Sequence, residues 1–354
     1  MRTAGSMRIR VVAIAALIAL VLTVRGHTLS AQQPQYVVGY SANPVPTDPL
    51  STAWDSVPAI EVPLIPQAGV TPALLTPSIA SVTVQAIHDD AHIAFRMVWA
   101  DPTRDVEAGR PDVFRDAAAI QFPVAAGVPS ICMGAAGQIS NIWHWKADWQ
   151  EDIDAGFQDI TRLYPHFFKD YYPFVEGEPP YSFPDDFSQP DARAYSPGWA
   201  VGNALSQPMR EWPIENLIAS GFGTLTTHEQ AAIEGRGVWE NGTWSVVFIR
   251  ELTPAAADLA TFQEAGELAT AFAVWNGSNE EVGARKQLSS FVTFGIEAPP
   301  VTPDEPVGEA PASRDTTLIV VLALLGAFVV AITLATIVVG RNAPPAPRDG
   351  GTGA

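Results

Sequence analysis

Apolar and polar residues alternate with a period of two along much of the chain's interior, and this alternation limits the fold to one built from β-strands. Residues 81–87 and 92–99 alternate in this way on either side of a short polar turn. Residues 237–240 and 243–250 are joined by Asn241-Gly242, a dipeptide that favours the type I′ turn of a two-residue hairpin. We therefore predict two β-hairpins.

The rest of the interior fits the same architecture. Residues 268–275 and 287–297 are predicted to be further strands. Helical periodicity is weak and predicts only short helices, at 150–163 and 255–264. The expected fold class is all-β, with an antiparallel β-sandwich over residues 32–297.

Residues 150–210 interrupt this pattern. The segment is crowded with proline, aromatic and acidic side chains, and it is unusually long for a connection inside a compact domain. It is either a functional insertion that covers a partner or an ordered excursion that packs on the domain's own surface, and the sequence leaves both open.

Hydrophobic runs near both ends of the sequence predict where the domain lies relative to the membrane. Residues 1–31 combine basic residues, an uncharged run at 11–24 that is too short to cross a bilayer, and a small-residue exit, as in a secretory signal peptide. A retained N-terminal anchor is the alternative. Residues 318–339 form a run of 22 residues without a charge, which predicts a transmembrane helix over 317–340.

The segments around this second run set its orientation. The tail at 341–354 carries Arg341 and Arg348, and basic residues on a short tail place it in the cytoplasm. The Pro- and acid-rich linker at 298–316 is predicted to be extended and solvated. We therefore expect an extracytoplasmic domain, periplasmic or on the outer face of the cell membrane, held by a single-pass anchor.

The chain is strongly acidic, with a formal net charge of −18. The signal segment contributes +4 and the tail +1, so the portion between them carries −23. Nucleic acid and anionic membrane surfaces are poor partners for such a domain, whereas a basic protein partner or a salty exterior suits it. Solubility is the simpler explanation of the charge.

Missing motifs exclude several kinds of chemistry. Cys132 is the single cysteine, so the chain has no internal disulfide, no C-x-x-C-H site for covalent haem and too few thiolates for an iron–sulfur cluster. No G-x-S-x-G nucleophile elbow occurs. His88 and His92 have a metal-like spacing, but they flank a predicted turn and are interpreted as a surface pair.

Lysine and methionine are scarce in a chain that has 17 arginines. After residue 31 there are three of each, which are Lys146, Lys169, Lys286, Met97, Met133 and Met209. A neutral lysine amine can coordinate a metal, whereas the permanently charged guanidinium of arginine cannot. Taken alone, Met133 is explained by core packing and Lys286 by a solvated charge.

Ordered blocks of sequence carry a resemblance to a known family. They are WDSVPAIEVPL, VQAIHDDAHIAFRMVWADPTRD, FRDAAAIQFPV, CMG, NIWHWKADW, GFGTLT, WSVVFIREL and AFAVWNGSNEEVGARKQLS. Between Trp54 and Glu297 the chain resembles the haem-b-binding gamma subunits of type II dimethyl-sulfoxide-reductase-family molybdoenzymes, such as ethylbenzene dehydrogenase gamma. Residues 150–210 match least. Related subunits serve dimethylsulfide dehydrogenases and selenate, chlorate and some nitrate reductases.

The resemblance implies a β-sandwich related to DOMON-type modules that holds a non-covalent haem b between axial Met and Lys ligands. On the matching residues it implies Met133, which follows the DAAAIQFP block, and Lys286, which follows the WNG turn. Met97 and His144 are the reserve candidates. Two protein ligands leave the iron no open position, which implies electron transfer without catalysis.

The resemblance also implies partners, namely an iron–sulfur beta subunit and a molybdenum-cofactor alpha subunit. An extracytoplasmic cytochrome or a quinone-linked membrane protein is expected to exchange electrons with them, and the C-terminal helix is expected to contact lipid. Trp143 and Trp145 either wall the haem pocket or fill the core. The rival hypothesis is a haem-free, surface-displayed β-sandwich module that binds carbohydrate or another ligand.

Overall fold

The computed structural model describes residues 36–125, 130–159, 162, 164, 166, 190–229, 232–263 and 266–300. The chain divides into two units, Met1–Pro299 and Pro300–Ala354, and all the elements below belong to the first. The predicted signal peptide at 1–31, transmembrane helix at 317–340 and tail at 341–354 lie outside the described residues. None of the helices that are described is long and apolar enough to span a bilayer.

The described residues form one sheet of fourteen strands. The strands are β1 (Tyr36–Tyr40), β2 (Ala59–Pro63), β3 (Ile65–Pro66), β4 (Ser81–His88), β5 (His92–Ala100), β6 (Ala117–Pro123), β7 (Ser140–Lys146), β8 (Ile214–Ala219), β9 (Thr226–Thr227), β10 (Glu234–Glu240), β11 (Thr243–Glu251), β12 (Glu267–Trp275), β13 (Gln287–Leu288) and β14 (Val292–Ile296). The helices are η1 (Thr52–Ser56), α2 (Ala147–Ala155), η2 (Pro190–Tyr195), α4 (Pro197–Ala200), η3 (Ala204–Ser206) and η4 (Gly277–Asn279).

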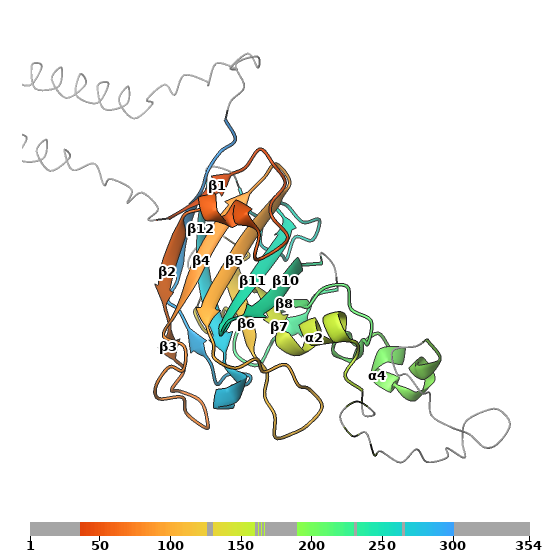
Figure 1. Ribbon diagram of the computed structural model, residues 1–354. Coiled ribbons are helices and arrows are strands. Elements are labelled where there is room, and N and C mark those ends of the chain that lie inside the picture. Colours follow the sequence, from red (N-terminus) through yellow and green to blue (C-terminus); the bar gives the residue numbers. More distant parts are fainter. Residues whose placement is uncertain are drawn as a thin grey trace, which may run out of the picture. The chain divides into compact units, whose positions relative to one another are not determined.

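The sheet curls so that its two halves face each other. Its order is β10-β11-β5-β4-β1-β14-β12-β6-β7-β8-β9, and Figure 1 shows β4, β5, β11 and β10 side by side with β6, β7 and β8 behind them. Aromatic rings meet between the halves: Phe95 of β5 lies 5.5 Å from Phe122 of β6, and Trp99 lies 6.2 Å from Trp145 of β7, measured between centroids. The main hydrophobic core therefore lies between the two halves.

The all-β prediction is confirmed, but the expectation of a purely antiparallel arrangement is wrong at β1. This strand runs parallel to both of its neighbours, β4 and β14. Parallel neighbours need a long connection between them, and β1 is separated from both of its partners by long stretches of sequence.

Both predicted hairpins are confirmed. β4 pairs with β5, and β10 with β11, in antiparallel register. Asn241 and Gly242 have φ values of 51° and 77°, the left-handed conformation that a type I′ turn needs at both central positions. The strand predicted at 268–275 is β12.

The last predicted strand, 287–297, is divided into β13 and β14. From Leu288 to Val292 the chain advances four residues while its partner β12 advances three. This extra residue is a β-bulge, which interrupts the ladder and bends the strand. Ser289 stabilises the break, since its backbone N–H donates to Phe272 O and its hydroxyl oxygen accepts from Phe272 N.

The two predicted helices have different outcomes. Helix α2 begins three residues before the predicted 150–163 helix and ends at Ala155, followed by the C-cap residue Gly156, whose φ is 96°. The described part of 255–264 contains no helix. Its backbone contacts the preceding segment instead, as Phe262 N donates to Leu252 O. Of the insertion at 150–210, residues 167–189 lie outside the described residues.

Gly237 on β10 is required by the core. A Cβ atom at this position would lie 2.3 Å from Cζ2 of the fully buried Trp145. We expect Gly237→Ala to displace this indole and to destabilise the chain by about 1–3 kcal/mol, as in other overpacked cores. Thermal unfolding of the full-length chain measures the effect. Gly69→Ala is the matched control, because a Cβ there meets nothing within 4 Å; equal losses in both variants would contradict the assignment.

Candidate functional site

A second apolar layer covers the outer face of the half-sheet formed by β6, β7, β8 and β12. Strand alternation produces it: along β6, Ala118 and Ile120 belong to the main core, whereas Ala117 and Ala119 point to the opposite face. We call this the outer layer. It consists of Ala117, Ala119, Ile142, Leu217, Ala219, Ala273 and Trp275, with Met133 and Leu288 packed on it.

The outer layer is built mostly from small side chains. Four of its seven buried residues are alanines. Ala119 lies directly opposite Ala273 on the neighbouring strand, and Trp275 lies opposite Ala117. These alanines are at most 9% exposed, because neighbouring side chains, Met133 among them, cover this face. The alanine run within β6 was the available signal for this surface, and the sequence reasoning did not use it.

Met133 lies on the loop between β6 and β7 and rests on the outer layer, half-buried. Its φ is 64°, a left-handed conformation that is uncommon for a residue other than glycine. The loop is held in place because Gly221 N donates to Met133 O at 3.0 Å. Strained backbone of this kind persists where the surroundings fix it, often at functional positions.

Lys286 reaches the same layer from the segment before β13. Its Nζ lies 5.1 Å from the ring centroid of Trp275. The hydrogen bond that it makes is a long one of 3.4 Å to Gly283 O, and no described carboxylate pairs with it. Burial lowers the pKa of Lys286 to about 8, and the thiol of Cys132, next to Met133, partly opposes this effect. The loops that carry Met133 and Lys286 therefore converge.

His144 lies close to this point as well. Its ring centroid is 4.9 Å from that of Trp275, and its Nε2 is buried without a hydrogen-bond partner among the described residues. Burial lowers the pKa of His144 well below its usual value, and the charges of Lys146 and Lys286 lower it further. The ring is therefore neutral, and this reserve candidate remains near the site.

Other residues singled out from the sequence lie elsewhere. Met97, the second reserve candidate, is fully buried in the main core. Trp143 and Trp145 are also fully buried there, so they fill the core and do not wall the outer layer. Alternation along β7 explains this, because the tryptophans flank His144 and point to the opposite face.

Lys146 is already paired, which separates it from Lys286. Its Nζ lies 2.5 Å from Oε2 of Glu215, with both side chains nearly buried, and 4.0 Å from the ring centroid of Trp149. Lys169 lies outside the described residues. Of the two described lysines, Lys286 alone lacks a carboxylate partner.

A hollow on the other half of the sheet does not compete with this site. It is lined by Thr47, Asp48, Leu50, Trp212, Glu234, Gly235, Arg236, Val238 and Ile249. None of these residues is a methionine, histidine, lysine or cysteine, so the hollow offers no thioether, imidazole, amine or thiol to a soft metal.

Comparison with known proteins places this chain among proteins of related sequence. A family model described as ethylbenzene dehydrogenase matches residues 51–287, a range that includes Met133 and Lys286. A protein of Haloferax mediterranei, provisionally named as a respiratory nitrate reductase heme subunit, is 29% identical over 287 residues, which cover 77% of this chain and 81% of the relative. Chlorate reductase subunit gamma of Ideonella dechloratans is 23% identical over 243 residues, 68% of this chain and 75% of the relative.

Solved structures are less similar. A family 9 carbohydrate-binding module of Caldicellulosiruptor kristjanssonii, in complex with glucose, aligns with 76% of this chain and 98% of its own. The identity is 10% and the TM-score 0.34, a likeness that carries no argument about fold or ligand.

Proposed function

The chain belongs to the ethylbenzene dehydrogenase family, and from this premise we propose that it is a haem-b-binding gamma subunit that transfers electrons within a molybdenum oxidoreductase complex. The relatives support the proposal by their names, because one is called a heme subunit of nitrate reductase and the other a gamma subunit of chlorate reductase. The proposed haem ligands are Met133 and Lys286.

One observation carries this proposal. Met133 and Lys286 are 153 residues apart in the sequence, yet both contact the outer layer, from loops close enough for Cys132 to influence the pKa of Lys286. A thioether and an amine without a carboxylate partner are two neutral donors that suit haem iron.

The residues of the outer layer fit a haem. The layer is apolar and built largely from alanines, a lining that suits contact with a flat macrocycle. Lys286 is desolvated and has no counter-ion among the described residues, which is costly for an ammonium group and favourable for a neutral amine. The unpartnered Nε2 of His144 adds a buried polar atom that still needs a contact.

The side chains of this site have separable roles in the proposed function. A bound haem would supply one-electron transfer, and two protein ligands would leave no position open for oxygen or substrate. Lys286 must lose its proton before its amine can donate a lone pair. The ring of Trp275 holds the charged form by a cation–π contact until then. Neutral His144 adds no positive charge beside it.

We further propose that the domain works outside the cytoplasm. The predicted signal peptide at 1–31 and the predicted transmembrane helix at 317–340 support a single-pass anchor with a cytoplasmic tail. The proposed partners are an iron–sulfur beta subunit, a molybdenum-cofactor alpha subunit and an external cytochrome or quinone-linked carrier. The acidic charge of the chain suits a basic carrier.

An absorption spectrum of the full-length chain, expressed with ample haem, tests the proposal. We expect the sharp α and β bands of a six-coordinate low-spin b-type haem after reduction, with one haem per chain. A chain that folds, as judged by circular dichroism, but takes up no haem would overturn the proposal. That result would favour the haem-free binding module.

Haem affinity is expected to increase with pH. The pKa of Lys286 is lowered to about 8 by burial, so the amine is protonated at low pH and neutral at high pH. Because a ligand must release its proton to bind a metal, affinity should rise by up to about tenfold per pH unit below pH 8 and level off above it. Haem titration of the haem-free chain from about pH 6 to 9 measures the slope. Lys286→Ala should remove it, and a pH-independent affinity in the parent chain would contradict the prediction.

A further inference from the structure

Three aspartates meet where strands from both halves of the sheet end. Asp101 directly follows β5, Asp116 directly precedes β6, and Asp105 lies on the loop between them. One carboxylate oxygen of each lies within 4.8 Å of the others. Asp101 and Asp116 are 0% exposed. Three carboxyl groups, two of them fully buried and that of Asp105 half-buried, are thus concentrated at one point.

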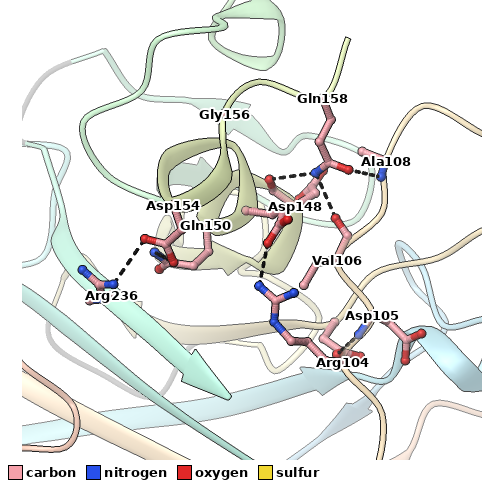
Figure 2. A network of polar contacts seen from close by, with 12 residues as sticks. Arg104, Asp105, Val106, Ala108, Asp148, Gln150, Asp154, Gly156, Gln158 and Arg236 are labelled. Atoms are coloured by element: carbon pink, nitrogen blue, oxygen red, sulfur yellow. Dashed lines mark hydrogen bonds and ion pairs between the residues drawn. The ribbon is translucent and has the colours of Figure 1, made fainter. Parts of the chain in front are cut away.

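The basic residues nearest in sequence do not neutralise this cluster. Arg104 binds Glu151 at 2.5 Å and Arg115 binds Asp148 at 2.9 Å, both on α2. In Figure 2 the Arg104 side chain reaches toward α2, whereas the carboxylate of Asp105 points away from that helix. Within the part of the chain that the structure describes, none of the three aspartates forms an ion pair.

Backbone and indole donors fix Asp116 but leave the rest of the cluster open. Its Oδ1 accepts from Gly277 N at 2.9 Å, and its Oδ2 accepts from Asp105 N at 2.8 Å and Trp244 Nε1 at 2.9 Å. Gly277 is the first residue of η4, Asp105 lies on the loop after β5, and Trp244 belongs to β11. The carboxylate is therefore held rigidly. Burial, together with the charge of Asp101, raises the pKa of Asp116 to about 7.

Asp101 supplies the observation that points to a ligand. Its Oδ2 is buried and has no hydrogen-bond partner among the described residues. The indole of Trp99 lies near Asp101 and lowers its pKa, and the Nε1 of this indole also has no hydrogen-bond partner among the described residues. The single hydroxyl proton of Thr103 is shared between Asp101 Oδ1 at 3.1 Å and Asp105 Oδ2 at 2.7 Å, so it can satisfy one of them at a time. Thr103 N also donates to Asp101 Oδ1, at 3.1 Å, so the buried oxygen of the cluster that lacks a donor is Asp101 Oδ2.

We propose that Asp101, Asp105 and Asp116 form a binding site for a hard divalent cation of the Ca²⁺ type. Oxygens bound to one Ca²⁺ at about 2.3–2.6 Å lie up to about 5 Å apart, which the spacing of the three carboxylates satisfies. A single proton would neutralise one carboxylate and leave two close negative charges, whereas a divalent cation can contact all three carboxylates. Ca²⁺ tolerates irregular cages of protein oxygens better than Mg²⁺, which demands an octahedron and retains water.

The cation would join the two halves of the sheet. It would link the end of β5 in one half to the start of β6 in the other, and Ala117, the first residue of β6, belongs to the outer layer. The site is separate from the proposed haem ligands, so its test does not depend on haem.

Calcium binding by the full-length chain tests the proposal. After chelation and dialysis, isothermal titration with CaCl2 is expected to show one site per chain, and Ca²⁺ in hundredfold excess over its Kd should raise the Tm by about 5 °C or more. Asp105→Asn should weaken binding at least tenfold and remove most of the Tm shift. Asp55→Asn, which removes one exposed carboxylate outside the cluster, should change neither.

If Asp105→Asn fails to fold, the Tm of the parent chain can still be compared between Ca²⁺ and chelator. A parent chain with the same Tm in both conditions and no titratable site would overturn it and would indicate a shared proton. Equal binding in the parent and in Asp105→Asn would also overturn it, because the bound ion would then lie elsewhere.

Discussion

Replacing Lys286 with alanine is expected to abolish the six-coordinate low-spin spectrum of the haem-loaded chain. The variant loses the amine that lies beside Trp275 without a carboxylate partner. Haem affinity should fall by more than about tenfold, since even changes in residues behind a metal ligand typically cost that much. Absorption and magnetic circular dichroism spectra of the full-length variant distinguish six-coordinate from five-coordinate iron.

Met133→Ala should give a second, different signature. It removes the thioether, a donor that tends to raise the reduction potential, so any haem that remains should have a lower midpoint potential than the parent. Lys286→Arg is the matched control for charge, because arginine keeps the positive charge but cannot coordinate. A low-spin spectrum retained by both Met133→Ala and Lys286→Ala would refute the assignment and direct attention to His144.

The second large effect is expected at the buried ion pair between Lys146 and Glu215. Glu215→Gln leaves the Lys146 ammonium, which is 8% exposed as a side chain, without its partner at 2.5 Å. Breaking such a pair typically costs about 3–5 kcal/mol, because one charge remains buried and uncompensated. For a domain of this size we expect the Tm to fall by about 6 °C or more in thermal unfolding of the full-length chain.

Two further variants isolate the charge effect. Glu240→Gln, at an exposed position on the β10–β11 turn, should change stability by less than about 0.5 kcal/mol. The double variant Lys146→Met/Glu215→Leu should be more stable than Glu215→Gln, because no unpaired charge is left inside. If the double variant were the less stable of the two, the pair would contribute more than the charge argument allows.

This ion pair also shows why scarcity alone was a weak guide to the haem ligand. Lys146 and Lys286 are equally rare in the sequence, and both lose part of their basicity through burial. Only their surroundings distinguish them, since Lys146 contacts Glu215 on the neighbouring strand β8 and Lys286 contacts an aromatic ring. Those surroundings depend on strand pairing, which a list of residue types does not contain.

Local patterns account for what was predicted correctly. Alternation identified the strands of both hairpins, and Asn241-Gly242 identified its turn, because side-chain direction and turn conformation depend on adjacent residues. The bulge at Ser289 was missed, since one extra residue changes the register against β12 without changing composition. The absence of a helix at 255–263 reflects backbone pairing with the preceding segment, as between Phe262 N and Leu252 O, which overrides weak local propensity.

The sequence by itself determined the all-β class, the hairpins and, through the resemblance of ordered blocks, the family and the two proposed donors. The tertiary structure alone decided that Met133 and Lys286 share one apolar layer, that Trp143 and Trp145 belong to the core, and that three aspartates meet at one end of the sheet. The physical reason is that strand alternation is local, whereas the choice of which strands pair, and so which faces meet, depends on contacts between residues far apart in the chain.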